Sequence, residues 1–319
     1  MSDLPTSTLG RTGATVTKLA YGAMELRGAR PGMPGRDLTA DEAKTILNGV
    51  LDAGITLIDT SPDYGRSEEL IGEFISHRRS EFFLSSKCGC PINPPPGQQS
   101  PLPHVFTREN VRAGVEQSLK RMKTDHIDLV QFHISPSRAE LEANDSVAEL
   151  VDLQRDGKIR FIGMSGVLPN LTDHIAMGVF DAFQIPYSAL EREHEASIHD
   201  ATAAGSGTII RGGVARGIPV SEAQALERLP ERFRQTYAKR RDLWDEAKLD
   251  EVLDGLERME FMLRFTLSHP DMTTTIVGTA NPKHLADNVA AARKGPLPAD
   301  QYAEAKRRLS AATAAAAAA

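Results

Sequence analysis

Four ionisable side chains stand at or just after the ends of apolar segments, where they could together transfer a proton. They are Asp59 of "TLIDT" (56–60), Tyr64 of "SPDYG", Lys87 of "FFLSSK" (82–87) and His133 of "DLVQFH" (128–133). Ionisable groups beside apolar strands cost free energy unless they meet one another. Their recurrence at the ends of three consecutive segments therefore predicts a shared site.

The chemistry of such a site follows from ordinary pKa values. A tyrosine has a pKa of about 10, too high for an efficient proton donor and acceptor near neutrality. We expect the Lys87 ammonium to lower the pKa of Tyr64, and Asp59 to pair with Lys87 and keep it charged. A neutral His133 would donate a hydrogen bond to a carbonyl oxygen. Because no side chain donates hydride, reduction of a carbonyl group at this site requires a redox cofactor.

Each of these residues also has an ordinary structural explanation when it is taken alone. An Asp at a strand end often caps a turn, a Lys there commonly reaches solvent, and a His in an apolar segment is commonly a core residue. Tyr before Gly is common in turns. Only their occurrence together, on neighbouring strands of one sheet, favours the catalytic interpretation.

Eight β-rich segments alternate with helical patterns and would position these residues. The segments are 18–22, 56–60, 82–87, 128–133, 160–165, 181–185, 207–211 and 273–278. Several are nearly continuous apolar runs, as expected of parallel strands buried on both faces. The alternation predicts an α/β protein, a (β/α)8 TIM barrel, whose active site lies at the carboxyl ends of the strands.

Further segments predict additions to the barrel within a single domain, 1–319. The segment "TSTLGRTGATV" predicts an N-terminal β-hairpin that plugs the bottom of the barrel. The charge-dense segment 219–257 predicts an exposed helical insert after the seventh predicted strand, 207–211. We expect helix N-caps at Thr39, Thr107 and Asn281, and one helix ending near Gly157. The alanine-rich tail, 310–319, is of low complexity and indicates no function.

Composition limits the possible partners. The net charge of −6 over 319 residues argues against a nucleic-acid binder, and no apolar run approaches the roughly 20 residues of a membrane span. The N-terminus "MSDLPTSTLG" lacks the features of a secretory signal, so we expect a cytoplasmic protein.

Cysteine is scarce. The only two, Cys88 and Cys90, form a C-x-C pair that lacks the two-residue spacer of zinc and redox motifs. No second ligand pair stands nearby in the sequence, so the sequence predicts no metal site.

Several segments together resemble the aldo-keto reductase family. They are "GITLIDTSPDYGRSEELIG", "LSSK", "DLVQFHISP", "IGMSG", "FQIPYS" and "TIVGTANPKHLADN", in the family's order over nearly the whole chain. The resemblance implies that Asp59, Tyr64, Lys87 and His133 form the family's catalytic tetrad, with Tyr64 as the general acid and base. It implies reversible reduction of a small aldehyde or ketone.

The resemblance also implies a nicotinamide cofactor bound without a Rossmann motif, and the chain has no G-x-G-x-x-G. NADP(H) is favoured and NAD(H) remains open, because Gly278 and His284 stand where many members have a basic pair. Carboxamide contacts would fall on Ser165 and Gln184, and Arg211 would lie against the nicotinamide or the pyrophosphate. Phosphate and adenine contacts would fall on "TIVGTANPKHLADN", the segment that contains the eighth predicted strand. The residues are Gly278, Thr279, Lys283, His284 and Asn288.

The sequence departs from the family pattern at two further places. Gly166 stands where members commonly have an asparagine that contacts the carboxamide, and Ile134, Ser135 and Pro136 replace a Trp-Pro pair.

Two other functions fit the same fold. Some relatives bind the cofactor as regulatory subunits with little turnover, and the 219–257 insert offers a docking surface for a partner protein. The second alternative is a lyase or isomerase that uses Lys87 as a Schiff-base nucleophile. The sequence indicates neither a particular carbonyl substrate nor an oligomeric state.

Overall fold

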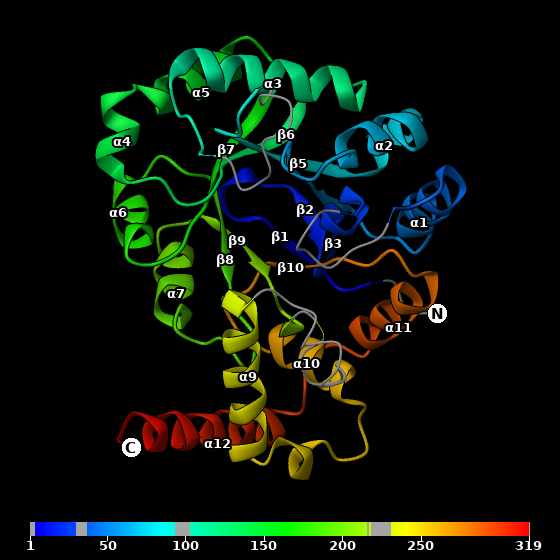
Figure 1. Ribbon diagram of the computed structural model, residues 1–319, viewed down its shortest axis with the longest axis vertical. Helices are drawn as coiled ribbons and strands as arrows, with labels where there is room; N and C mark the ends of the chain where they lie inside the picture. Colours follow the sequence, from blue (N-terminus) through cyan, green and yellow to red (C-terminus); the bar gives the residue numbers. More distant parts are fainter. Residues whose placement is uncertain (1–3, 30–36, 93–102, 216, 218–230, 319) are drawn as a thin grey trace.

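The protein forms a closed barrel of eight parallel strands surrounded by helices (Figure 1). The computed structural model describes residues 4–29, 37–92, 103–215, 217 and 231–318. The strands follow in the order β10-β3-β4-β5-β6-β7-β8-β9 around the barrel. The predicted (β/α)8 TIM barrel is therefore confirmed.

Each of the eight predicted segments is a barrel strand. They are β3 (Leu19–Gly22), β4 (Leu57–Asp59), β5 (Phe83–Cys88), β6 (Ile127–Phe132), β7 (Ile159–Ser165), β8 (Ala182–Pro186), β9 (Gly207–Arg211) and β10 (Thr274–Val277). Their register sets Asp59 beside Ser85 and Lys87 beside Gln131. The polar strand ends thus gather at one rim.

Helices surround this barrel on the outside (Figure 1). The α-helices are α1 (Ala40–Asp52), α2 (Ser67–Phe74), α3 (Arg108–Met122), α4 (Arg138–Ala143), α5 (Ser146–Arg155), α6 (Asn170–Met177), α7 (Glu195–Ala203), α9 (Glu231–Glu246), α10 (Arg258–Leu267), α11 (Pro282–Arg293) and α12 (Ala299–Ala318). The 3-10 helices are η1 (Gly10–Thr12), η2 (Ala23–Arg27), η3 (Ser76–Glu81) and η5 (Leu249–Val252). Within the described ranges, no helix is both long and apolar enough to cross a membrane.

The predicted helix starts are confirmed by their capping hydrogen bonds. Thr39 accepts from the backbone N–H of Glu42, whose carboxylate accepts in return from the Thr39 N–H, forming a capping box. Thr107 and Asn281 likewise cap α3 and α11.

The predicted helix end near Gly157 is confirmed, because α5 ends at Arg155 and Gly157 has φ 74°. The prediction of a single helix is wrong, because two helices occupy the stretch before Gly157. α4 ends at Ala143 and α5 begins at Ser146. Asp145 between them has φ 50°, the left-handed region that interrupts a right-handed helix. The apolar periodicity continues across this break, which is why the sequence pattern did not reveal it.

The N-terminal hairpin closes the amino end of the barrel, as predicted. β1 (Thr6–Thr8) pairs with β2 (Thr15–Thr17). Leu9 and Val16 are fully buried with Leu57 and Leu129 from the barrel interior. The backbone N–H of Arg11 donates to Gly205 O at 2.8 Å, which holds the turn against the segment before β9.

The insert after β9 contains the predicted helix, α9, and residues 218–230 lie outside the described residues. The expectation that the insert is exposed throughout is wrong for Trp244, which is buried and packs edge-on against Phe261. Its indole N–H donates to Asp250 at 3.2 Å. Ala247 and Leu249, which follow α9 in the same insert, are buried as well. The high charge density of α9 made these buried residues hard to predict from the sequence. The tail is also helical as far as Ala318, as the end of α12.

Candidate active site

A buried ion pair lies at the carboxyl ends of β4 and β5. Lys87 Nζ donates to Asp59 Oδ1 and to Thr60 O, the latter at 3.1 Å. Asp59 Oδ1 also accepts from Ser85 Oγ at 2.9 Å and from Gln131 Nε2 at 3.1 Å. Both charged residues are only 1 % exposed. A buried pair needs such additional hydrogen bonds to offset desolvation.

Sequence reasoning found Asp59 and Lys87 but missed Ser85 and Gln131. The signal was available, because both are polar residues within apolar strands. Gln131 also donates to Ser85 Oγ at 2.7 Å, so β4, β5 and β6 are joined through one network. We call Asp59, Ser85, Lys87 and Gln131 the strand network.

Tyr64 is held over this rim by the turn that follows β4. Its backbone N–H donates to Ser61 O at 3.0 Å, and its carbonyl accepts from Ser67 N at 2.9 Å. Gly65 follows with φ 51°, and a side chain there would bring a Cβ within 2.3 Å of Arg27 O. The turn therefore requires glycine directly after Tyr64.

The electrostatic environment of Tyr64 differs from the expectation. Burial raises the pKa of Tyr64 above its usual range, the Asp59 charge adds to the rise, and Arg211 opposes both. The pKa of Tyr64 is therefore raised and not lowered as expected, and Arg211 is the cation with the largest influence on it. Among the described residues, Tyr64 is also not a hydrogen-bond partner of Lys87. A phenol in this setting retains its proton at neutral pH.

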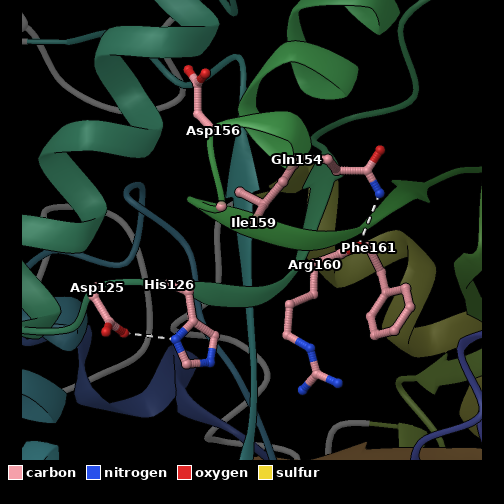
Figure 2. A pocket seen from close by; sticks show the side chains of 8 residues that line it. Asp125, His126, Gln154, Asp156, Ile159, Arg160 and Phe161 are labelled. Atoms are coloured by element: carbon pink, nitrogen blue, oxygen red, sulfur yellow. Dashed lines mark hydrogen bonds and ion pairs between the residues drawn. The ribbon is translucent and has the colours of Figure 1, made fainter.

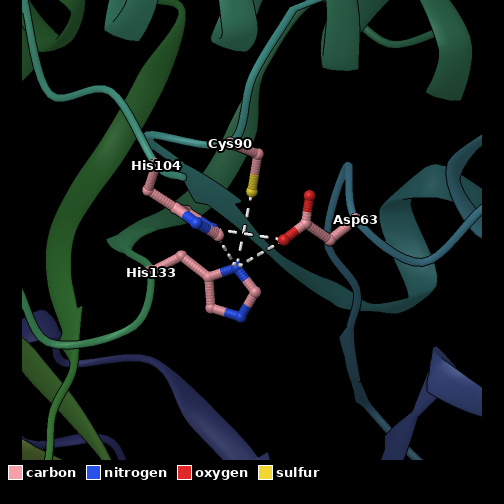
Figure 3. A group of neighbouring side chains, drawn as sticks. All are labelled: Asp63, Cys90, His104 and His133. Atoms are coloured by element: carbon pink, nitrogen blue, oxygen red, sulfur yellow. Dashed lines mark hydrogen bonds and ion pairs between the residues drawn. The ribbon is translucent and has the colours of Figure 1, made fainter. Parts of the chain in front are cut away.

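His133 follows β6 and completes the predicted group. Its ring lies edge-on to Tyr64 with ring centroids 6.3 Å apart, and its backbone N–H donates to Cys88 O at 3.1 Å. Burial lowers the pKa of His133, which favours the neutral imidazole. Its Nδ1 faces Asp63, Cys90 and His104 (Figure 3).

Two cofactor candidates, Ser165 and Gln184, are neighbours at the ends of β7 and β8. Ser165 Oγ donates to Gln184 Oε1 at 3.3 Å. Gln184 Nε2 is buried and makes no hydrogen bond within the described part of the chain. A buried amide donor without a partner is costly, and a carboxamide oxygen would satisfy it.

The departure at Gly166 has a packing reason. A Cβ at this position would lie 2.9 Å from Leu171 Cδ1 and 3.3 Å from Met164 Cγ. An asparagine would therefore need its neighbours to move.

Arg211 ends β9 and is close enough to the rim for its charge to affect the pKa values of both Tyr64 and Lys87. Gly278 directly follows β10, where a Cβ would lie 2.7 Å from Gly22 O. The chain can approach β3 this closely only without a side chain.

The remaining cofactor candidates lie around the start of α11. Thr279 is buried, and its carbonyl accepts from Tyr21 Oη at 2.8 Å. Lys283 and His284 are exposed, and Lys283 pairs with Asp287 at 2.7 Å, whereas Asn288 is half-buried. A helix N-terminus at the carboxyl rim of a barrel suits a phosphate group.

Figure 2 shows the side chains that line a surface hollow. The hollow lies at the starts of β6 and β7, and therefore at the opposite end of the barrel. Asp125 and His126 precede β6, and Arg160 and Phe161 belong to the amino half of β7. The contact between His126 Nδ1 and Asp125 Oδ1, at 2.7 Å, is a surface hydrogen bond between adjacent residues. Active sites of such barrels lie at the other face, so we assign no chemistry to this hollow.

A model of the aldo/keto reductase family matches residues 18–309, nearly the whole chain. The protein belongs to the aldo/keto reductase family and is an oxidoreductase. Its curated relatives include oxidoreductase YqkF of Bacillus subtilis, 25 % identical and covering 89 % of this chain and 90 % of that protein. The NADH-specific methylglyoxal reductase of Escherichia coli is 25 % identical over 89 % of this chain and 92 % of its own length.

A solved structure with the same fold is the holo form of aldo-keto reductase AKR11C1 from Bacillus halodurans. The TM-score is 0.78 over 96 % of both chains, at 23 % identity. At that identity the likeness supports the fold alone.

Proposed function

We propose that this protein is an NAD(P)H-dependent reductase that reversibly converts a small aldehyde or ketone to the alcohol, with Tyr64 as proton donor. The observation that carries the proposal is the buried Lys87–Asp59 pair at the ends of β4 and β5, with the Tyr64 and His133 rings 6.3 Å apart in the segments that follow β4 and β6. Family membership supports carbonyl reduction in general. The methylglyoxal reductase shows that one relative acts on a small dicarbonyl compound with NADH.

The nicotinamide cofactor would supply hydride to the carbonyl carbon when bound. Gln184 and Ser165 fit its carboxamide, because the buried Gln184 Nε2 offers a donor. Thr279 and the start of α11 fit its phosphates.

The chain's own residues would then handle the carbonyl oxygen. Tyr64 transfers its phenolic proton to that oxygen as hydride reaches the carbon, and His133 orients the oxygen by a hydrogen bond. The hydrogen bonds of the strand network hold the Asp59 and Lys87 side chains in place at the ends of β4 and β5. Lys87 is buried and tied to Asp59, which favours this electrostatic role over a Schiff-base nucleophile.

The decisive experiment is Tyr64→Phe, assayed by the loss of reduced-nicotinamide absorbance with small aldehydes. We expect kcat to fall by about 100-fold or more, while the affinity for cofactor, measured by fluorescence titration, stays within about twofold of wild type. An unchanged kcat would remove Tyr64 as proton donor. Wild-type protein that binds cofactor but never consumes it would instead support the regulatory alternative.

Cofactor preference is tested separately by titrating NADPH and NADH in parallel. We propose NADP(H) as the preferred cofactor, with Lys283 pairing with the 2′-phosphate in place of Asp287. Lys283→Ala should then weaken NADPH binding and leave NADH binding unchanged. Equal weakening of both cofactors would contradict this role.

A further inference from the structure

Four potential metal-ligating side chains converge between the Tyr64 turn and His133. Asp63, Cys90, His104 and His133 each offer one ligand atom, and all four atoms lie within 4.8 Å of one another (Figure 3). We call these residues the loop cluster. They come from the turn after β4, the segment between β5 and α3, and the residue after β6. We propose that the loop cluster binds one divalent transition-metal ion of the zinc class.

The distances among the ligand atoms are those of a tetrahedral zinc site. With ordinary zinc bond lengths, two nitrogen or oxygen ligands are about 3.3 Å apart, and a sulfur and a nitrogen about 3.6 Å apart. His104 Nε2 lies 3.2 Å from His133 Nδ1 and 3.1 Å from Asp63 Oδ2. His133 Nδ1 lies 3.5 Å from Asp63 Oδ2 and 3.4 Å from Cys90 Sγ. For these four pairs a metal ion would require shifts of only a few tenths of an ångström, and the two remaining pairs, from Cys90 Sγ to Asp63 and to His104, lie within 4.8 Å.

Hydrogen bonding alone explains this convergence poorly. His133 Nδ1 has three polar neighbours within 3.5 Å, namely Asp63 Oδ2, Cys90 Sγ and His104 Nε2. One ring nitrogen carries at most one N–H, which points in one direction. A cation among the four atoms would satisfy all of them at once.

The ligand chemistry selects the class of metal. One thiolate and two imidazoles favour zinc and similar transition metals, whereas Mg²⁺ and Ca²⁺ prefer oxygen ligands. A thiolate and a carboxylate neutralise a divalent ion, which suits a half-buried site. Four protein ligands are typical of a closed, structural zinc site.

Neighbouring groups hold the ligands in place. Ser61 Oγ lies 3.6 Å from Cys90 Sγ, and Asn110 Nδ2 donates to Cys90 O at 3.2 Å. Val105 N donates to Gly89 O at 2.8 Å, which brings the two ends of the 90–104 segment together. Such surrounding contacts are a usual feature of metal sites.

The site would act on the catalytic residues through position. A metal on Nδ1 fixes the His133 tautomer with its proton on Nε2, which faces away from the loop cluster (Figure 3). Asp63 directly precedes Tyr64, so the same ion would fix the Tyr64 turn. This consequence for catalysis rests on the proposed reductase function, whereas metal binding does not.

The test is a titration of chelator-treated, full-length protein with Co²⁺, followed by displacement with Zn²⁺. Wild type should bind one equivalent of Co²⁺ with visible d–d bands and a thiolate-to-cobalt charge-transfer band, and Zn²⁺ should abolish both. Cys90→Ala should lose the charge-transfer band and bind about 100-fold more weakly or worse. Cys88→Ala is the matched control, because that buried thiol lies outside the loop cluster, and it should behave as wild type.

Absence of a charge-transfer band in wild type at a large excess of Co²⁺ would overturn the proposal, as would wild-type binding by Cys90→Ala. His104→Ala provides a second variant should Cys90→Ala fail to fold, and it should weaken Co²⁺ binding while leaving the thiolate in place. Tyr64→Phe should bind Co²⁺ as wild type does. Metal binding and turnover can therefore fail independently.

Discussion

Two groups of four side chains share the carboxyl rim of the barrel and differ in how their charges are balanced. The strand network belongs to β4, β5 and β6 and contains its own cation, Lys87, against Asp59. The loop cluster lies outside the strands and combines a carboxylate, a thiol and two imidazoles, with no permanent cation among the four. The first group is electrostatically complete, and the second is complementary to a positively charged ligand.

Removing the cation of the strand network should have the largest effect. Lys87→Met leaves Asp59 buried without its partner charge, so we expect a loss of about 3–5 kcal/mol in the free energy of unfolding. Urea denaturation measures this loss. The double variant Asp59→Leu/Lys87→Met should recover much of it, because both charges are then removed. A single variant as stable as wild type would show that the pair is not desolvated.

Removing one neutral donor from the strand network should have an intermediate effect. Ser85→Ala deletes the 2.9 Å hydrogen bond to the buried Asp59 carboxylate. Hydrogen bonds to charged groups contribute roughly 2 kcal/mol, and we expect a destabilisation of that size in urea. A value near zero would mean that Gln131 and Lys87 satisfy Asp59 without Ser85.

The matched change beside the loop cluster should have the smallest effect on stability. Ser61→Ala removes a hydroxyl 3.6 Å from Cys90 Sγ, a weak contact with sulfur. Without metal we expect less than about 0.5 kcal/mol of change in the free energy of unfolding. Zn²⁺ affinity should nevertheless fall about tenfold, since the hydroxyl supports a ligand. If Ser61→Ala and Ser85→Ala changed the free energy of unfolding equally without metal, the proposed difference between the strand network and the loop cluster would be contradicted.

The strand network was partly predictable because the strand pattern fixes which residues reach the rim. Asp59 and Lys87 end apolar runs, and parallel strands bring their carboxyl ends to one edge. The polar side chain of Gln131 inside the apolar run "DLVQFH" was a signal, but one polar residue in a strand does not show which side chain it contacts. Its role follows only from the register of β5 and β6, which sets it beside Lys87.

The loop cluster was not predictable from spacing. Its ligands stand at positions 63, 90, 104 and 133, and no two of them have the separation of a zinc motif. Cys90 has only Cys88 as a neighbouring thiol in the sequence, so the C-x-C pair suggested no metal site. Three separate segments approach one another only when the barrel closes.

The sequence by itself determined the order of strands and helices, the positions of the main helix caps and the four catalytic candidates. Those features depend on local periodicity, capping residues and the direction of each strand, all of which neighbouring residues control. Only the tertiary structure decided the partners of Asp59, the raised pKa of Tyr64 and the convergence of the loop cluster. Those properties depend on burial and on distances between segments far apart in the chain, which local patterns do not encode.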